Sequence, residues 1–205
     1  MNEPIYPISG YPTVYHSPAG TPMTLRPMVP EDQEALLAFF QRVPAEDRLY
    51  LRDDVTSPGL VSRWAQTLDY RRTLPLLALH DDRIIGDGTL HHSRIPARQH
   101  VAEVRIVMDP DYRHQGLGRT LLRHLMILAA AEDRALEKLT FEVVADTEQT
   151  AQRAAQALGF VQVAVLAKHV RYYGGAPHDL LVLEYQVGEA PPDAVGDEPA
   201  DYMLF

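Results

Sequence analysis

Residues 101–129 have the pattern of a strand, a glycine-containing turn and a helix. Apolar and polar residues alternate over 101–108, and apolar residues recur at helical spacing from Thr120 to Ala129. The turn between them is Arg113-His114-Gln115-Gly116-Leu117-Gly118-Arg119. The free N–H groups in the first turn of a helix and its positive dipole end attract anions, and phosphate is the usual one. This stretch therefore predicts that the chain binds a phosphorylated cofactor.

The turn differs from two common phosphate-binding loops. A P-loop has Lys-Ser or Lys-Thr after its second glycine, whereas Arg119 follows Gly118 here. A dinucleotide-binding turn has three glycines and an acidic residue about 20 positions further on. Only Gly116 and Gly118 are present in this turn. The cofactor is therefore expected to be of another kind.

The turn resembles the acyl-CoA-binding motif of the GNAT acetyltransferase superfamily, Arg/Gln-x-x-Gly-x-Gly/Ala, in Arg113, Gly116 and Gly118. A second stretch, 147–160, resembles the helix ending in Leu-Gly-Phe that follows a strand in the same superfamily. Acetyl-CoA is the co-substrate that this resemblance implies, and no metal is implied. The residues that it implies for cofactor binding are Ile106, Val107, Met108, Arg113, His114, Gln115, Gly116, Leu117, Gly118 and Arg119.

The resemblance implies an α+β fold with a central mixed sheet of about seven strands and about four flanking helices. The strands over 101–108 and 138–144 are expected to lie parallel and to splay apart at the cofactor. The other strands predicted from apolar patterning are 24–28, 74–80, 83–92, 161–171 and 180–187. The acetyltransferase domain is expected over 24–187, after an N-terminal arm of residues 1–23 and before an acidic tail of residues 188–205. Residues 1–22 are expected to form either a short edge hairpin or an ordered arm.

Glu103, on the strand predicted to hold the cofactor, is the candidate catalytic residue. An amine is protonated near neutral pH, since the pKa of lysine is about 10.4, and it loses a proton before it attacks a thioester. A carboxylate takes that proton directly or through one water, and several relatives within the resemblance have a glutamate here. Glu103 and Arg105 share a strand face, so an ion pair between them is the alternative interpretation.

Two positions depart from the superfamily pattern. Glu148 stands where an asparagine often contacts the pantetheine arm, and Ala155 stands where a tyrosine often serves as the general acid. Because alanine has no proton to donate, the tyrosine-acid mechanism is excluded at this position. Tyr172 and Tyr173 are candidate replacements, although tyrosines beside a hairpin loop more often pack their rings and leave their hydroxyls in water.

The nearest resemblance within the superfamily is to the acetyltransferase domain of bacterial protein-lysine acetyltransferases. It rests on Leu25-Arg26-Pro27-x-x-Pro30-Glu31-Asp32 followed by Glu46-Asp47-Arg48-x-Tyr50-x-Arg52, on Glu103, and on alanine in place of tyrosine at Ala155. The implied reaction is acetyl transfer from acetyl-CoA directly to an amine, either a protein lysine or a small molecule. The alternative is a domain of the same fold that binds acyl-CoA as a sensor without turning it over.

Composition argues against several other classes of protein. A net charge of −9 argues against nucleic acid as a partner. No apolar run approaches the roughly 18 residues that span a membrane, so a cytoplasmic location is expected. The absence of cysteine excludes disulfides and an acetyl-cysteine intermediate. His91 and His92 are expected to line a pocket rather than bind a metal, because neighbours on a strand face opposite ways. A homodimer is left open.

Overall fold

The computed structural model describes residues 8–48, 51, 53–132, 136–172 and 175–188. The strands are β1 (Thr13–His16), β2 (Pro22–Pro27), β3 (Thr73–His80), β4 (Arg83–His92), β5 (Val101–Met108), β6 (Lys138–Val144), β7 (Val161–Arg171) and β8 (Pro177–Gln186). The α-helices are α1 (Gln33–Arg42), α2 (Ala45–Arg48), α3 (Pro58–Gln66), α4 (Leu117–Glu132) and α5 (Gln149–Ala157). Short 3-10 turns occur at η1 (Pro30–Asp32), η2 (Pro96–Arg98) and η3 (Pro110–Tyr112). None of the described helices is long and apolar enough to cross a membrane.

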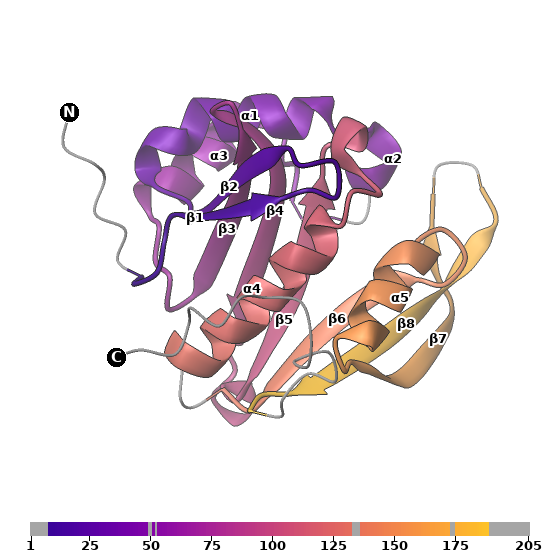
Figure 1. The fold of residues 1–205 in the computed structure, drawn as a ribbon. Helices are drawn as coiled ribbons and strands as arrows, with labels where there is room; N and C mark the ends of the chain where they lie inside the picture. Colours follow the sequence, from indigo (N-terminus) through magenta and orange to yellow (C-terminus); the bar gives the residue numbers. More distant parts are fainter. Residues whose placement is uncertain (1–7, 49–50, 52, 133–135, 173–174, 189–205) are drawn as a thin grey trace.

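The eight strands form one mixed sheet in the order β1-β2-β3-β4-β5-β6-β8-β7 (Figure 1). The α+β fold class is confirmed, with one strand and one helix more than predicted. The extra strand is β1, an edge strand that residues 13–16 of the expected arm add beside β2. The extra helix is α2, a single turn at 45–48. The acidic tail from residue 189 onward lies outside the described residues.

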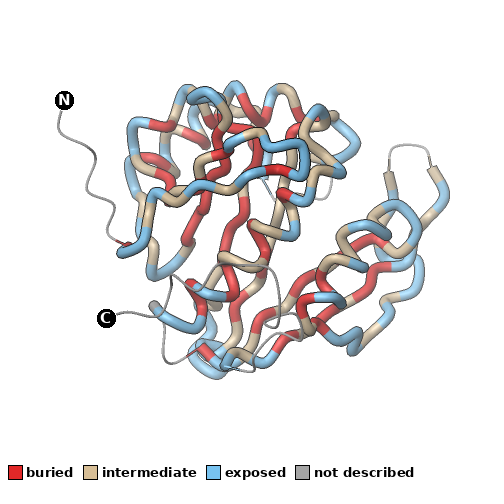
Figure 2. The backbone as a smooth tube through the Cα atoms, in the orientation of Figure 1, coloured by how far each residue is buried: buried red, intermediate tan, exposed pale blue. Residues whose placement is uncertain are grey.

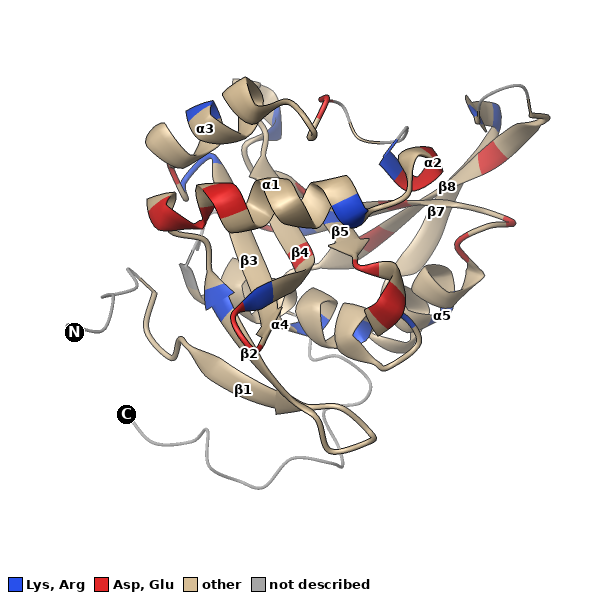
Figure 3. Ribbon diagram, turned by 90° about the horizontal axis from the view of Figure 1, so that it is seen from above, with Lys and Arg blue, Asp and Glu red and all other residues tan. Residues whose placement is uncertain are grey.

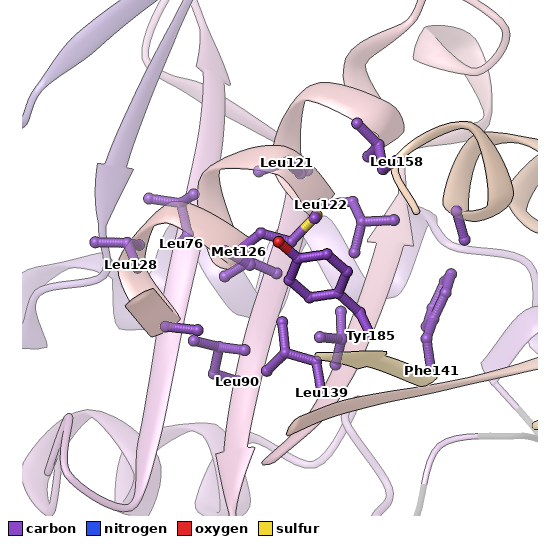
Figure 4. Close-up of a cluster of buried hydrophobic side chains, with 14 of the residues drawn as sticks. Leu76, Leu90, Leu121, Leu122, Met126, Leu128, Leu139, Phe141, Leu158 and Tyr185 are labelled. Atoms are coloured by element: carbon purple, nitrogen blue, oxygen red, sulfur yellow. The ribbon is translucent and has the colours of Figure 1, made fainter. Parts of the chain in front are cut away.

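Helix α4 covers one face of the sheet and buries the larger core (Figure 4). Leu121 and Leu125 lie one helical turn apart on its inner face and are fully buried. Gly88 on β4 lets the helix approach closely, because a Cβ there would lie 3.1 Å from Leu125 Cδ1. Burying each leucine contributes about 1.5–3 kcal/mol relative to exposure. The position of α4, and of the turn that precedes it, is therefore fixed by apolar packing.

Helices α1 and α3 cover the opposite face of β3 and β4 with a second, smaller core. Phe39 of α1 and Val61 of α3 are fully buried against Leu77 and Ile84 of the sheet. In Figure 2 the buried segments follow the central strands and the inner sides of the helices. This second cluster ends before β6, so the face of the sheet beyond β5 is left without a helix on this side.

Strands β5 and β6 pair in parallel over only four positions, from Val101↔Lys138 to Val104↔Phe141. Both strands continue beyond this ladder without pairing to each other, β5 to Met108 and β6 to Val144. Figure 1 shows β6, β8, β7 and α5 turned away from the β1–β5 half of the sheet. The predicted splay between these two strands is confirmed, and it opens a gap within the sheet.

Candidate active site

The gap between β5 and β6 exposes main-chain hydrogen-bonding groups of β5. The Asp109 N–H donates to Ile85 O on β4 at 2.9 Å, whereas His100 O accepts from Lys138 N–H on the β6 side at 3.0 Å. Main-chain groups of an antiparallel pair alternate in direction. The N–H and C=O groups of Ile106 and Met108 therefore point into the gap, while those of Val107 point toward β4. An extended ligand in the gap would replace the missing strand partner.

The glycine turn after η3 presents free main-chain donors at the start of α4. His114 has φ 61° and Gly116 has φ 81°, and these two left-handed residues fold the chain back into the helix. Thr120 N–H is bonded to Gly116 O at 3.1 Å, so the N–H groups of the three preceding residues have no acceptor inside the helix. The turn thus has the form of an anion cradle, as the sequence predicted, although anion binding itself stays a prediction.

Strand β1 braces this turn, which the sequence did not indicate. The Tyr15 hydroxyl donates to Gln115 O at 3.1 Å. A Cβ at Gly116 would lie 2.8 Å from the Tyr15 hydroxyl, so glycine is required here by space as well as by its φ. The N-terminal strand therefore holds the cradle in place from outside the domain that the resemblance covers.

Arg113 lies at the top of the gap and bridges three elements. Its Nη2 donates to Asp47 Oδ2 of α2 at 2.7 Å and to Met108 O at 3.2 Å. Figure 3 shows α2, which carries both acidic and basic positions, beside the end of β5. The guanidinium is thus in the gap, where a phosphate group of a ligand would compete with Asp47 for it. The role of Arg113 in phosphate binding stays a prediction.

Glu148, at the start of α5, closes the other side of the gap. Its Oε2 accepts from Val144 N–H at 2.6 Å, so the carboxylate satisfies the last main-chain donor of β6. Burial raises the pKa of Glu148, and the nearby charge of Asp47 raises it further. The residue that replaces the expected asparagine therefore lies in the gap and is already engaged with the main chain.

Asp109 ties the end of β5 to two other elements just before the turn. Its Oδ2 accepts from Arg42 Nε of α1 at 2.9 Å and from Arg83 Nη2 of β4 at 2.8 Å, and its Oδ1 accepts from Asp111 N–H at 3.2 Å. Burial alone would raise the pKa of Asp109, but the two guanidinium groups outweigh it and hold the pKa below its ordinary value. The start of the turn is therefore anchored by a buried ion-pair cluster.

A cavity of about 870 Å³ lies on the face of the sheet opposite α4 and reaches the edge of the gap. Phe40 of α1 and Trp64 of α3 form part of its wall, and β4, β5 and β6 form its floor. Val107 and Glu142, which border the gap, also line it. The cavity thus gives a second molecule access to whatever the gap holds.

Glu103 lies on the floor of this cavity and is paired with Arg105. Its Oε1 accepts from Arg105 Nε and Nη2, both at 2.7 Å, and the two side chains are 20% and 21% exposed. The ion pair that the sequence offered as the alternative is therefore present. A base role for Glu103 stays a prediction.

Ala155 is fully buried in the larger core, so α5 has no proton donor at this position. Tyr172 is partly buried, with its hydroxyl 3.3 Å from Thr147 Oγ1, and burial raises its pKa. Tyr173 lies outside the described residues. His91 and His92 both line the cavity. Among the described residues, no group of three or more His, Asp or Glu side chains could hold a metal ion.

A family model described as the acetyltransferase (GNAT) family matches residues 34–160, which span α1 to the start of β7. The chain belongs to the GNAT family. Acetyltransferases of this family use acetyl-CoA. The protein is thus a GNAT-family N-acetyltransferase. No curated protein is matched by the sequence.

Three solved structures illustrate how closely the GNAT fold is kept. A GNAT-family acetyltransferase from Streptococcus pneumoniae has a TM-score of 0.67 and 21% identity, covering 81% of this chain and 99% of that one. The GNAT domain of S. lividans PAT has a TM-score of 0.67 and 18% identity, and the match covers 89% of this chain and 99% of that domain. YncA from Salmonella typhimurium, solved with its cofactor acetyl-CoA, has a TM-score of 0.67 and 19% identity. The match covers 84% of this chain and 98% of that one. At these identities the likeness shows the fold alone.

The substitution Gly118→Val should weaken acetyl-CoA binding without disturbing the protein. A Cβ at Gly118 meets no atom within 4 Å, so the free protein has room for a side chain there. A ligand that lies against the main chain at the start of α4 has no such room, and we expect the Kd from calorimetry to rise by roughly tenfold or more.

The matched control is Gly59→Val. Gly59 is also the second residue of a helix, in α3, and its surroundings are equally open. Both variants replace glycine with a somewhat better helix former and so change helix stability by the same small amount, but only the change in α4 should alter the affinity. An unchanged affinity for acetyl-CoA in Gly118→Val would remove the turn from the cofactor site.

Proposed function

We propose that this enzyme transfers an acetyl group from acetyl-CoA directly to a primary amine that enters the cavity, with a protein lysine side chain as the first candidate. The observation that carries the proposal is the open β5–β6 gap beside a cavity whose floor carries carboxylates. An aliphatic chain fits against Phe40 and Trp64, and a terminal ammonium fits the carboxylates opposite them. One side of the cavity is thus apolar and the other is suited to a cation.

The proposed roles follow from the positions of the residues. The N–H groups of residues 114–119, with Arg113 and Arg119, hold the diphosphate. The main-chain groups of Ile106 and Met108 bind the pantetheine arm and, through a free N–H, the oxyanion of the attacked thioester. The side chain of Val107 borders the acetyl group from the cavity side.

Glu103 takes a proton from the ammonium group as the amine enters the cavity. The neutral nitrogen then attacks the thioester carbonyl carbon, and no residue of the enzyme becomes acetylated. Direct attack is favoured because the chain contains no cysteine, and an acetyl-cysteine intermediate is impossible without one. The reaction therefore requires both substrates to be bound at the same time.

Release of free CoA thiol tests the proposed function. The enzyme is mixed with acetyl-CoA and either lysine peptides or a set of small amines, and thiol release is followed with time. We expect release that depends on an amine, and the preferred amine identifies the acceptor. A protein that binds acetyl-CoA but releases no thiol with any amine is a sensor module, and this result would contradict the proposal.

Initial rates against both substrates test direct transfer. Because both substrates are bound together, double-reciprocal lines at several acetyl-CoA concentrations should intersect. Parallel lines are the sign of a covalent acetyl-enzyme. Mass spectrometry of the enzyme after incubation with acetyl-CoA alone gives an independent check, and a transferable acetyl adduct would contradict direct attack.

A further inference from the structure

Asp87 of β4 is a carboxylate in the cavity to which the sequence assigned no role. It pairs in register with Val107 of β5, at the level where the β5–β6 ladder has already opened. Glu103 lies four residues before Val107 on β5, about 13 Å away along the strand, and pairs with His91. Asp87 is therefore level with the open part of the gap, whereas Glu103 is level with the closed part.

Asp87 differs from Glu103 and Asp109 in its partners. Its Oδ1 accepts from Thr89 Oγ1 at 2.9 Å, and no cation contacts it among the residues that the structure describes. By contrast, Glu103 is held by Arg105, and Asp109 by two arginines. Burial disfavours the charged form of a carboxyl group, and here no cation of the described residues offsets this effect. Burial raises the pKa of Asp87 to about 6, although the Thr89 hydroxyl lowers it.

The apolar neighbours of Asp87 explain its isolation. Gly86 and Gly88 on either side face α4, where a Cβ would lie 3.1 Å from leucine side chains, so α4 packs closely against this part of β4. Leu77, its register partner on β3, is fully buried. The charged or titratable side chains of β4, β5 and β6 that line the same cavity are His91, His92, Glu103, Arg105 and Glu142.

The reaction also needs a group for its last proton transfer. After attack, the amine nitrogen still carries one proton more than the amide product, and the departing sulfur needs one. A single group beside the reacting carbon meets both needs if it accepts the proton from nitrogen and gives it to sulfur. Ala155 cannot do so, and the Tyr172 hydroxyl is engaged with Thr147.

Resting on the proposed acetyl transfer, we propose that Asp87 is the proton shuttle of this reaction. Its carboxylate accepts the proton from the nitrogen of the tetrahedral intermediate. The oxyanion electron pair re-forms the C=O bond, and the C–S bond breaks with its electron pair on sulfur. The Asp87 carboxylic acid then protonates that sulfur, directly or through one water, which leaves the amide, the CoA thiol and an ionised Asp87.

The variant Asp87→Asn tests this role, because asparagine keeps the shape but cannot shuttle a proton. We expect kcat to fall by about 10²–10⁴-fold, with the Kd for acetyl-CoA unchanged. The pH profile of kcat/KM in the wild-type enzyme should change slope near pH 6, and the variant should lose this change of slope. Asp82→Asn, which removes an exposed carboxylate from the turn between β3 and β4, outside the cavity, should keep both the rate and the profile.

Thr89→Val gives a second test that does not depend on how Asp87→Asn folds. Removing the hydroxyl removes the hydrogen bond that lowers the pKa of Asp87, so the change of slope should move to higher pH. An active wild-type enzyme with a normal rate in Asp87→Asn, or an unmoved profile in Thr89→Val, overturns the shuttle and leaves the proposed function standing. A wild-type enzyme that releases no thiol at any pH overturns the proposed function, and the shuttle with it.

Discussion

Glu103→Gln should lower kcat by about 10²–10⁴-fold while leaving the affinity for acetyl-CoA nearly unchanged. Glutamine keeps the shape and the hydrogen-bonding capacity of the side chain but cannot take the proton of an ammonium group. Glu103 lies in the cavity and outside the open part of the gap, so the cofactor should not sense the change. Steady-state rates with a saturating amine and calorimetry with acetyl-CoA measure the two quantities.

Arg105→Gln is the control for this experiment, since it breaks the same ion pair and leaves the carboxylate in place. If Glu103 is a base, Arg105→Gln should keep its rate within about tenfold of the wild-type rate. Similar small losses in both variants would show that Glu103 serves only the ion pair, and its place in the mechanism would be lost.

Asp109→Ala should destabilise the protein by about 3 kcal/mol, near the lower end for breaking a buried ion pair. Asp109 is only 1% exposed and holds Arg42 and Arg83 together at the end of β5. Both arginines are partly exposed, at 32% and 42%, so water can reach them once the carboxylate is gone, which keeps the cost moderate. For a chain of this size we expect Tm to fall by roughly 10 °C in thermal unfolding at pH 7.

The pH dependence of this loss follows from the lowered pKa of Asp109 in the folded protein. A carboxyl group with a depressed pKa stabilises the fold above its unfolded pKa, near 3.9, and loses this contribution as the pH falls through its folded pKa. The difference between Asp109→Ala and wild type should therefore be full above about pH 5 and shrink in acid. Asp111→Asn is the matched control, because its carboxylate is 79% exposed and 3.8 Å from Arg83. A loss in Asp111→Asn as large as in Asp109→Ala would contradict the assignment.

The strands that combine clear alternation with long apolar runs could be predicted to the residue, as 101–108, 138–144 and 161–171 show. Gly159, in the Leu-Gly-Phe stretch that follows α5, has a φ of 94°, the left-handed conformation that commonly ends a helix. For residues 1–22 the sequence left a short edge hairpin and an ordered arm open, because Thr13–His16 is short and half-exposed, with no buried face to impose a period. This segment is a strand because β2 offers a free edge.

The candidate site was less predictable, because its partners come from distant parts of the chain. The contact between Arg113 and Asp47 joins residues 66 positions apart, and no local pattern signals it. Asp87 did leave a signal, since it is the one charged residue between Ile84 and Leu90, in an apolar strand. The surroundings of Asp87 could not be predicted in the same way. Whether an arginine lies beside it depends on how distant parts of the chain fold together.

Amide hydrogen exchange with and without acetyl-CoA tests most directly whether the β5–β6 gap and the α4 cradle hold the cofactor. The N–H groups of Ile106 and Met108 point into the gap and should exchange quickly in the free protein and slowly with acetyl-CoA bound. The N–H groups of residues 114–119 should gain protection with them. Val107, whose N–H points toward β4, should be protected in both states and serves as the internal control. Protection confined to other segments, or no change at these amides at saturating acetyl-CoA, would contradict the account.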